Sequence, residues 1–400
     1  MASGVVPLGR YPSLALRISQ SGAIMLRELI QAAGPYGSLL IIAQRFGLDG
    51  AGYFSWAQAL TLPIFQLLSF QLKPLMLTHS AAEIPLRLGL RLRTLLLAPT
   101  LLAVLGLSLF GGLLVGIMAA SRALDHWAEM YQSDWQRHGQ AQRALLGSTL
   151  RTFTLLSALL LAPSAEMGFG IWFLLSGITL LACEFRATQA DPANLPLKPL
   201  LWRGSLLGIV LFLQAAQASF PRLALEHFCD RKTLGLFATL TVVVQAGNLL
   251  ASGYGQSLLP RLAESEGWRL WRFILFPGLF GLLLLGVAFA GRVWFSSLAT
   301  VLPLPLETST LLLVFAAPVF VWPAAVVGCA LTAKRLYRTQ IFIGLALNVI
   351  VAASSYFLIP RGGLPAALLV LAISGASMLI LASFAIRATE ADRLPGASYA

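Results

Sequence analysis

Charged residues are scarce in this chain of 400 residues, and acidic residues are the scarcest of them. Only 11% of the chain is Asp, Glu, Lys or Arg, while 58% is hydrophobic. Soluble domains carry about a quarter charged residues. The composition therefore excludes a large soluble core and predicts a polytopic membrane protein.

Cysteine, histidine and the common catalytic motifs are also missing or sparse. The three cysteines (Cys183, Cys229 and Cys329) are far apart and the four histidines are dispersed, so neither a disulfide framework nor a metal site is predicted. We find no GxxxxGK[ST], HExxH or GxSxG motif and no module that binds nucleic acid. We therefore expect no enzyme, no cofactor, no metal and no nucleic-acid partner.

Long apolar runs dominate the chain, and twelve of them are long enough to cross a membrane at about 20 residues each. They cover residues 22–43, 52–77, 94–110, 112–132, 145–163, 167–183, 204–221, 234–257, 273–291, 307–331, 339–359 and 364–386. The third and fourth runs lie so close together that few residues are available for two crossings, and Gly111 and Gly112 form the predicted turn between them. A single span followed by an amphipathic helix on the membrane surface is the competing interpretation there.

The 28 basic residues favour twelve spans. With twelve, twenty of them fall on the side that holds both chain ends, and six on the other: Arg45, Arg222, Arg231, Lys232, Arg292 and Arg361. Removing one span would move fourteen of the twenty to the opposite side. Because cytoplasmic loops are rich in Lys and Arg, we expect both termini in the cytoplasm.

An internal repeat at an offset of 183 residues divides the spans into two sets of six. Gln31-Ala32-Ala33 matches Gln214-Ala215-Ala216, and Gly52-Tyr53-Phe54 matches Gly235-Leu236-Phe237. We predict an all-α protein of about 12 transmembrane helices in two six-helix bundles around a central cavity. The predicted parts are a cytoplasmic tail (1–21), an N-terminal bundle (22–184), a cytoplasmic linker (185–203), a C-terminal bundle (204–386) and a second cytoplasmic tail (387–400).

One stretch places charge inside a predicted span. On a helix, the polar side chains between Ser121 and Arg143 gather on about a third of the circumference. They include Arg122, Asp125, His126, Glu129, Ser133, Gln136 and Gln140. An unpaired charge in lipid costs several kcal/mol, so this face should line a cavity or pair within the protein. Arg122 could instead form a structural ion pair with Asp125 or Glu129.

Further polar side chains lie inside the first and seventh spans. Arg27 and Gln31 share a helix face, and Gln214 is the repeat equivalent of Gln31. Candidate cavity-lining residues are thus Arg27, Gln31, Arg122, His126 and Gln214. The alternatives are that Arg27 extends to the cytoplasmic interface and that the glutamines hydrogen-bond neighbouring helices.

Three blocks of the sequence resemble one family of transporters. They are RFGLDGAGYFSWAQALTLPIFQLLSFQLKPLM, RALDHWAEMYQSDWQRHGQAQRALLGSTLR and GLFATLTVVVQAGNLLASGYGQSLLPRLAESE. Together they are similar to the Wzx-type polysaccharide flippases of the multidrug/oligosaccharidyl-lipid/polysaccharide exporter (MOP) superfamily. The similarity covers most of residues 17–270.

This resemblance implies a two-bundle transporter that moves a polyprenyl-diphosphate-linked oligosaccharide between leaflets by alternating access. It also implies a bacterial inner-membrane location, membrane-lipid contacts and a role in polysaccharide or lipopolysaccharide biosynthesis beside polymerase or glycosyltransferase partners. The family's cavity is typically cationic, and Arg27 and Arg122 are the best-placed residues for binding the diphosphate. Asp125 or Glu129 could bind a coupling proton or Na⁺. The alternative function is a cation-coupled efflux transporter for small molecules.

Overall fold

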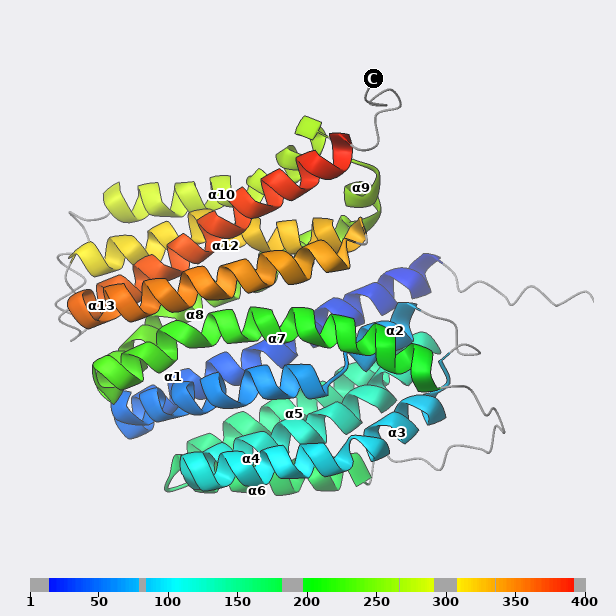
Figure 1. The fold of residues 1–400 in the computed structure, drawn as a ribbon. Helices are drawn as coiled ribbons and strands as arrows, with labels where there is room; N and C mark the ends of the chain where they lie inside the picture. The colour runs from blue at the N-terminus through cyan, green and yellow to red at the C-terminus, as the bar shows by residue number, and fades with distance from the viewer. Residues whose placement is uncertain are drawn as a thin grey trace, which may run out of the picture.

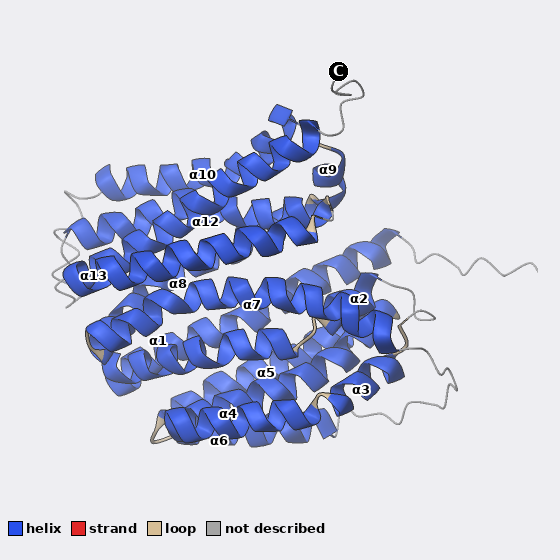
Figure 2. Ribbon diagram, viewed as in Figure 1, coloured by secondary structure: helices blue, strands red, loops and turns tan. Residues whose placement is uncertain are grey.

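The structure is a computed structural model, which describes residues 14–78, 84–181, 197–265, 267–290, 308–334 and 336–391. Within these ranges the regular elements are all helices (Figure 2). The ends of both predicted tails, most of the linker 185–203, Cys183 and Arg292 lie outside the described residues.

The helices fall into two groups along the chain, which we call the N-half and the C-half. The N-half contains α1 (Leu14–Leu68), α2 (Leu72–Thr78), α3 (Leu86–Leu95), α4 (Leu97–Arg137), α5 (Ala141–Leu161) and α6 (Ala165–Thr179). The C-half contains α7 (Leu197–Phe228), α8 (Arg231–Ser257), α9 (Leu259–Glu264), α10 (Gly267–Ala290), α12 (Thr308–Ala333) and α13 (Tyr337–Ala391).

Three of the longest helices are each interrupted by one glycine. The backbone is non-helical at Gly47 in α1 (φ 75°), Gly112 in α4 (φ 80°) and Gly363 in α13 (φ 50°). Positive φ values of this kind are strained for residues with a Cβ, which explains why glycine occupies these positions. The predicted turn at Gly111-Gly112 is therefore confirmed.

The glycine turns account for the number of spans. Seven described helices are long and apolar enough to cross a membrane, judged by length and composition: α4, α5, α7, α8, α10, α12 and α13. Helix α1, with 55 residues, and the shorter apolar α6 complete the set. Divided at Gly47, Gly112 and Gly363, these nine helices provide twelve segments, so the prediction of about twelve transmembrane helices is confirmed.

The halves pack along a shared interface made by three helices. Helix α1 contacts both α7 and α8, while α4, α5 and α6 pack behind α1 and α10, α12 and α13 pack behind α7 and α8. In Figure 1 the helices run roughly side by side, with α7, α8 and α1 between the outer layers. We call the end that carries the turns at Gly47, Gly112 and Gly363 the hairpin end, and the opposite end, with the described chain ends, the terminal end.

Each half has its own apolar core. In the N-half Phe54 stacks on Phe169 with ring centroids 5.2 Å apart, in a cluster shared by α1, α4, α5 and α6. In the C-half Trp322 donates its indole N–H to the Val244 carbonyl oxygen at 2.9 Å, which satisfies the one polar group of a buried side chain. The N-half cluster also includes Ala238 of α8, so the two cores are continuous where α1 packs on α8.

Large apolar side chains also cover the outside of the molecule. Leu109, Phe110 and Leu161 are 81%, 73% and 84% exposed, and most of one side of α10 is exposed and apolar. Such continuous apolar surface is unfavourable in water and is the surface that lipid requires. The chain is therefore a multi-pass integral membrane protein.

Two predicted helix limits near the polar stretch are wrong. The second span was expected to reach residue 77, but α1 ends at Leu68, and Phe70 and Gln71 have positive φ before the short α2 begins. Helix α4 ends at Arg137, so Gln140 is not on its polar face and instead precedes α5 as its N-cap residue. Gly139, with φ of 76°, makes the turn between these helices.

Candidate functional site

The polar stretch of α4 is divided among several neighbours, and its terminal-end part is bound to α1. Arg27, only 1% exposed, donates to the side-chain oxygens of Gln136 (2.9 Å) and Gln132 (3.1 Å). Gln31 donates to Ser148 of α5 at 3.2 Å and to Gln132 at 3.4 Å. These bonds hold α1, α4 and α5 together, so Arg27 and Gln31 lie within the N-half and not on an open wall.

The two acidic residues of the stretch each interact with an arginine of another helix. Asp125 accepts from Arg151 of α5 at 3.3 Å, and the Arg151 side chain is 8% exposed. Glu129 interacts electrostatically with Arg93 of α3, which donates to the Leu68 carbonyl oxygen at 3.1 Å. Burial lowers the pKa of Arg93 to about 10, with Glu129 opposing the shift, so Arg93 stays protonated at neutral pH.

Arg122 is left with one hydrogen bond in the described part of the chain. Its Nε donates to the Thr61 hydroxyl at 3.1 Å, and that hydroxyl donates to the Ala57 carbonyl oxygen at 2.8 Å. Asp125 interacts with Arg122 electrostatically, but its ion pair is with Arg151. The contact with Thr61 therefore fixes the guanidinium while leaving its two terminal nitrogens to bind something else.

The predicted position of Arg222, outside the spans, is wrong. Arg222 was counted among the charges outside the spans because the seventh run was ended at Pro221. Helix α7 continues through Pro221 to Phe228, so Arg222 lies within the helix. A proline near a helix end is compatible with continuation, and the apolar residues Leu223 and Leu225 that follow were the available signal.

Arg222 of the C-half lies near enough to Arg122 of the N-half for their charges to interact. The two guanidinium groups interact electrostatically, and Arg222 also interacts with Tyr36 of α1. Arg222 has no hydrogen bond or ion pair to any described residue. Glu226, one helical turn away, binds Arg231 at 2.9 Å. Two partly exposed arginines, one from each half, thus influence each other electrostatically, and neither forms an ion pair with a carboxylate of the described residues.

The remaining candidate residues are less closely connected to this pair. His126 packs beside the Phe65 ring, with centroids 5.8 Å apart. Gln214 is exposed on α7 and makes no hydrogen bond to the residues that the structure describes. Its repeat equivalent Gln31 is hydrogen-bonded inside the N-half, so the two glutamines have different environments.

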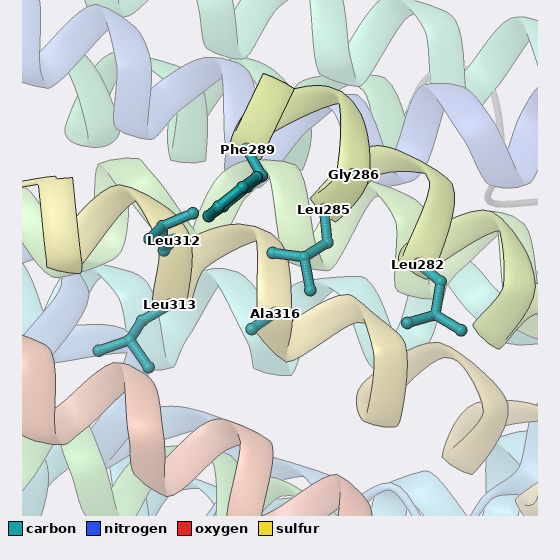
Figure 3. Close-up of a pocket in the computed structure, with 7 residues that line it drawn as sticks. All are labelled: Leu282, Leu285, Gly286, Phe289, Leu312, Leu313 and Ala316. Carbon is teal, nitrogen blue, oxygen red and sulfur yellow. The ribbon is translucent and has the colours of Figure 1, made fainter. Parts of the chain in front are cut away.

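A separate cavity of about 490 Å³ lies between α10 and α12. Its lining consists of apolar residues and a glycine (Figure 3): Leu282, Leu285, Gly286, Phe289, Leu312, Leu313 and Ala316. With no polar side chain in its lining, it offers nothing to bind a hydrated ion. In the described ranges, no three His, Cys, Asp or Glu side chains are grouped so that they could hold a metal.

Comparisons with known proteins agree with this architecture. No family model matches the chain. The capsular polysaccharide biosynthesis protein CapF of Staphylococcus aureus is 24% identical over 386 residues, covering 88% of this chain and 94% of CapF. Among solved structures, the lipid II flippase MurJ in an inward closed conformation matches with a TM-score of 0.63 and 14% identity, over 94% of this chain and 88% of that one.

A multidrug transporter matches almost equally well. The MATE multidrug transporter DinF-BH has a TM-score of 0.62 and 13% identity, over 97% of this chain and 98% of that one. The chain has the fold of the MOP-superfamily transporters. The resemblance to Wzx-type flippases that the sequence indicated is supported by the match to CapF over nearly the whole length of both chains.

Proposed function

We propose that this protein moves a polyprenyl-diphosphate-linked oligosaccharide from the inner to the outer leaflet by alternating access, with the diphosphate bound between Arg122 and Arg222. The observation that carries the proposal is this pair of arginines from opposite halves, with neither bound to a carboxylate. Names of two similar proteins, a capsular polysaccharide biosynthesis protein and a lipid II flippase, support the class of substrate.

The chemistry of such a substrate matches this site. A diphosphate carries several negative charges and is strongly hydrated, so it crosses lipid only if the protein replaces its water with cations and hydrogen-bond donors. An arginine donates two parallel hydrogen bonds to phosphate oxygens, and charge-assisted bonds of this kind are about twice as strong as neutral ones. Arg122 can donate from its two terminal nitrogens, and Arg222 can donate from its whole guanidinium. The polyprenyl tail remains in the bilayer.

Orientation and location form part of the same proposal. The excess of basic residues at the terminal end supports our proposal that both chain ends lie in the cytoplasm of a bacterium, with the hairpin end facing outward. Glycosyltransferases that make the glycan would then act at the terminal end, and a polysaccharide polymerase would receive it at the hairpin end. We propose no catalytic role for any residue of the chain.

Efflux of a small molecule coupled to a cation is the second candidate, favoured by the match to a MATE transporter. Its coupling residue would be an acidic group exposed to water between the halves. Asp125 is 43% exposed but bound to Arg151, and Glu129 lies beside Arg93. Both carboxylates therefore already have cationic partners, which favours the lipid-linked glycan.

The test of the proposed function replaces each arginine of the pair in the organism that makes the glycan. We expect Arg122→Ala and Arg222→Ala each to reduce surface polysaccharide at least about tenfold, because each removes charge-assisted bonds worth about 1.5–3 kcal/mol. Arg222→Lys should keep part of the activity, since the charge remains but the paired donors are lost. Lipid-linked glycan should accumulate on the cytoplasmic leaflet.

The matched control is Arg361→Ala. Arg361 is an exposed arginine near the turn at Gly363, and it donates to the Phe357 carbonyl oxygen at 2.6 Å within its own helix. This variant should export normally. Normal export by both Arg122→Ala and Arg222→Ala, with the proteins present in the membrane, would refute the proposed function. Resistance to small cationic compounds conferred by the parent protein would favour efflux.

A further inference from the structure

The cavity between α10 and α12 lies next to a place where these helices pack very closely. A Cβ atom on Gly281 of α10 would be 2.9 Å from the backbone nitrogen of Val319 in α12, and one on Gly278 would be 3.2 Å from the carbonyl oxygen of Val319. Glycines of this kind let two membrane helices approach each other. The cavity lies on the hairpin-end side of this contact, between residues 282–289 of α10 and 312–316 of α12.

The sequence explains why space is left on that side. Pro318 stands at the boundary between the close contact and the cavity, and a proline inside a helix bends it because it cannot donate to the carbonyl oxygen four residues earlier. Gly286 of α10 has no side chain, and a Cβ atom there would meet no atom within 4 Å. Ala316 on the facing helix contributes only a methyl group. Small residues beside a proline therefore leave a cavity of about 490 Å³.

The cavity opens toward the outside of the molecule. Leu282 and Phe289, which line it, are 50% and 63% exposed, and Figure 3 shows the Phe289 ring pointing from α10 toward α12. Their neighbours Leu283 and Val287 are 60% and 58% exposed. The cavity is thus continuous with the apolar outer face of α10, which contacts lipid in the membrane.

The depth of the cavity places it in one leaflet. Leu282 is eight residues before Ala290, the last residue of α10, and Ala316 is eight residues after Thr308, the first residue of α12. At 1.5 Å per residue the cavity therefore extends roughly 12 Å from the hairpin end of both helices. The hydrocarbon core of a bilayer is about 30 Å thick, so one leaflet supplies about 15 Å of it. The cavity lies within the leaflet at the hairpin end.

A space of this size and polarity is suited to hydrocarbon. Protein interiors contain few voids larger than a water molecule, because the atoms around a void lose their van der Waals contacts. Water does not fill an apolar cavity, since it finds no hydrogen-bond partner there. A hydrocarbon chain from the surrounding leaflet is apolar and flexible, and it reaches the cavity from the side on which the cavity is open.

We propose that an acyl chain of a phospholipid in the hairpin-end leaflet occupies this cavity and completes the packing of α10 against α12. Phospholipids form the leaflet that the opening faces, and the lining has no polar side chain that would select a rarer lipid. Among the described helices α10 packs chiefly on α12, so the chain adds contacts where α10 has few others. This inference does not depend on the transported substrate.

The test uses the full chain in nanodiscs of phosphatidylcholine that contain a small fraction of phosphatidylcholine with a diazirine in the middle of one acyl chain. Light releases N₂ from the diazirine, and the resulting carbene inserts into neighbouring C–H bonds. Mass spectrometry of the digested protein then locates the adducts. We expect more adducts per residue in 282–289 and 312–316 than in residues 101–109 of α4, where Leu102 and Leu109 are 69% and 81% exposed to lipid.

Two substitutions fill the cavity from opposite helices. Gly286→Leu adds a side chain from α10, and Ala316→Leu adds one from α12. Each should lower the adduct yield in 282–289 and 312–316 about fivefold or more, because the added atoms compete with the chain for the same space. The unfolding midpoint should not fall in Gly286→Leu, since its first added atom enters open space, and circular dichroism checks this.

Gly106→Leu is the matched control. Gly106 is exposed on α4, six residues from the turn at Gly112, and a Cβ atom there would also meet no atom within 4 Å. This variant should leave the adduct yield in 282–289 and 312–316 unchanged. A second control adds a polyprenyl monophosphate to the nanodiscs at the mole fraction of the probe. It should displace no more adducts than the same amount of unlabelled phosphatidylcholine.

Four outcomes would overturn the inference. They are no excess of adducts at the cavity over residues 101–109, an unchanged yield in both Gly286→Leu and Ala316→Leu, an equal fall in Gly106→Leu, and selective displacement by the polyprenyl monophosphate. The last result would assign the cavity to a polyprenyl chain instead of a phospholipid. None of these measurements involves export, so failure here leaves the proposed function untouched.

Discussion

Three arginines in the membrane region have the same side chain but different bonding partners, and these partners determine what each arginine does. Arg27 is buried and hydrogen-bonded to two glutamines of α4. Arg151 is bound to Asp125. Arg122 keeps most of its guanidinium unbound beside Arg222. Arg27 and Arg122 were both predicted to line the cavity. The sequence contains no information about which neighbouring side chain each of them contacts.

Arg27 should therefore matter for stability more than Arg122 does. We expect Arg27→Met to lower the free energy of unfolding by about 1–3 kcal/mol, because it removes the two side-chain hydrogen bonds by which the buried Arg27 joins α1 to Gln132 and Gln136 of α4. Arg122→Met should cost less, since Arg122 is partly exposed and its partner Thr61 keeps its bond to Ala57. Thermal unfolding of the purified variants in detergent measures the difference. Equal losses would contradict this distinction.

The single glycines that reverse α1, α4 and α13 determine how many times the chain crosses the membrane. Gly47 and Gly112 combine φ near 80° with ψ near 180°, a region that essentially only glycine adopts. Any residue with a Cβ atom would be strained at these φ and ψ values, even where no neighbouring atom is close. These turns fix where each long helix folds back, and so place Arg122 ten residues from the hairpin end.

Gly47→Ala isolates this backbone requirement. A Cβ atom at Gly47 would meet no atom within 4 Å, so any effect comes from φ of 75° and not from a clash. We expect a loss of about 1–3 kcal/mol in stability, measured as a lower unfolding midpoint. The control Gly22→Ala, on the same helix but with helical φ, should be neutral or stabilising by up to about 1 kcal/mol. An unchanged midpoint in Gly47→Ala would show that the turn tolerates a side chain.

At the scale of the whole molecule, the orientation in the membrane decides which leaflet each end serves. Cys229, between α7 and α8 at the hairpin end, is exposed and unpaired. With Cys183 and Cys329 replaced by alanine, we expect a membrane-impermeant maleimide to label Cys229 in intact cells. A control cysteine at Gln142, at the terminal end, should react only after permeabilisation. The reverse pattern would invert the proposed orientation.

The pH dependence of this labelling follows from the surroundings of Cys229. Partial burial, and next the carboxylate of Asp230, raise the pKa of the thiol, so its thiolate fraction at pH 7 is below that of an ordinary cysteine and increases as the pH rises. A hydrogen bond from the Thr233 backbone N–H lowers the pKa of Asp230, which stays ionised over this range. We expect faster labelling at pH 9 than at pH 7, and faster labelling at pH 7 in Asp230→Asn. Asparagine still caps α8, so a rate unchanged by this substitution would exclude the electrostatic effect.

The amino-acid sequence by itself determined the class of the protein, the number of spans and the resemblance to MOP-superfamily flippases. These depend on the length of apolar runs, on glycine turns and on the distribution of basic residues, all of which are local or summed properties. Tertiary structure alone decided that Arg27 is internal, that Asp125 binds Arg151 and that Arg222 interacts electrostatically with Arg122. The partners lie on different helices and come together only when α1, α4, α5 and α7 pack, and no periodicity within one helix encodes those pairings.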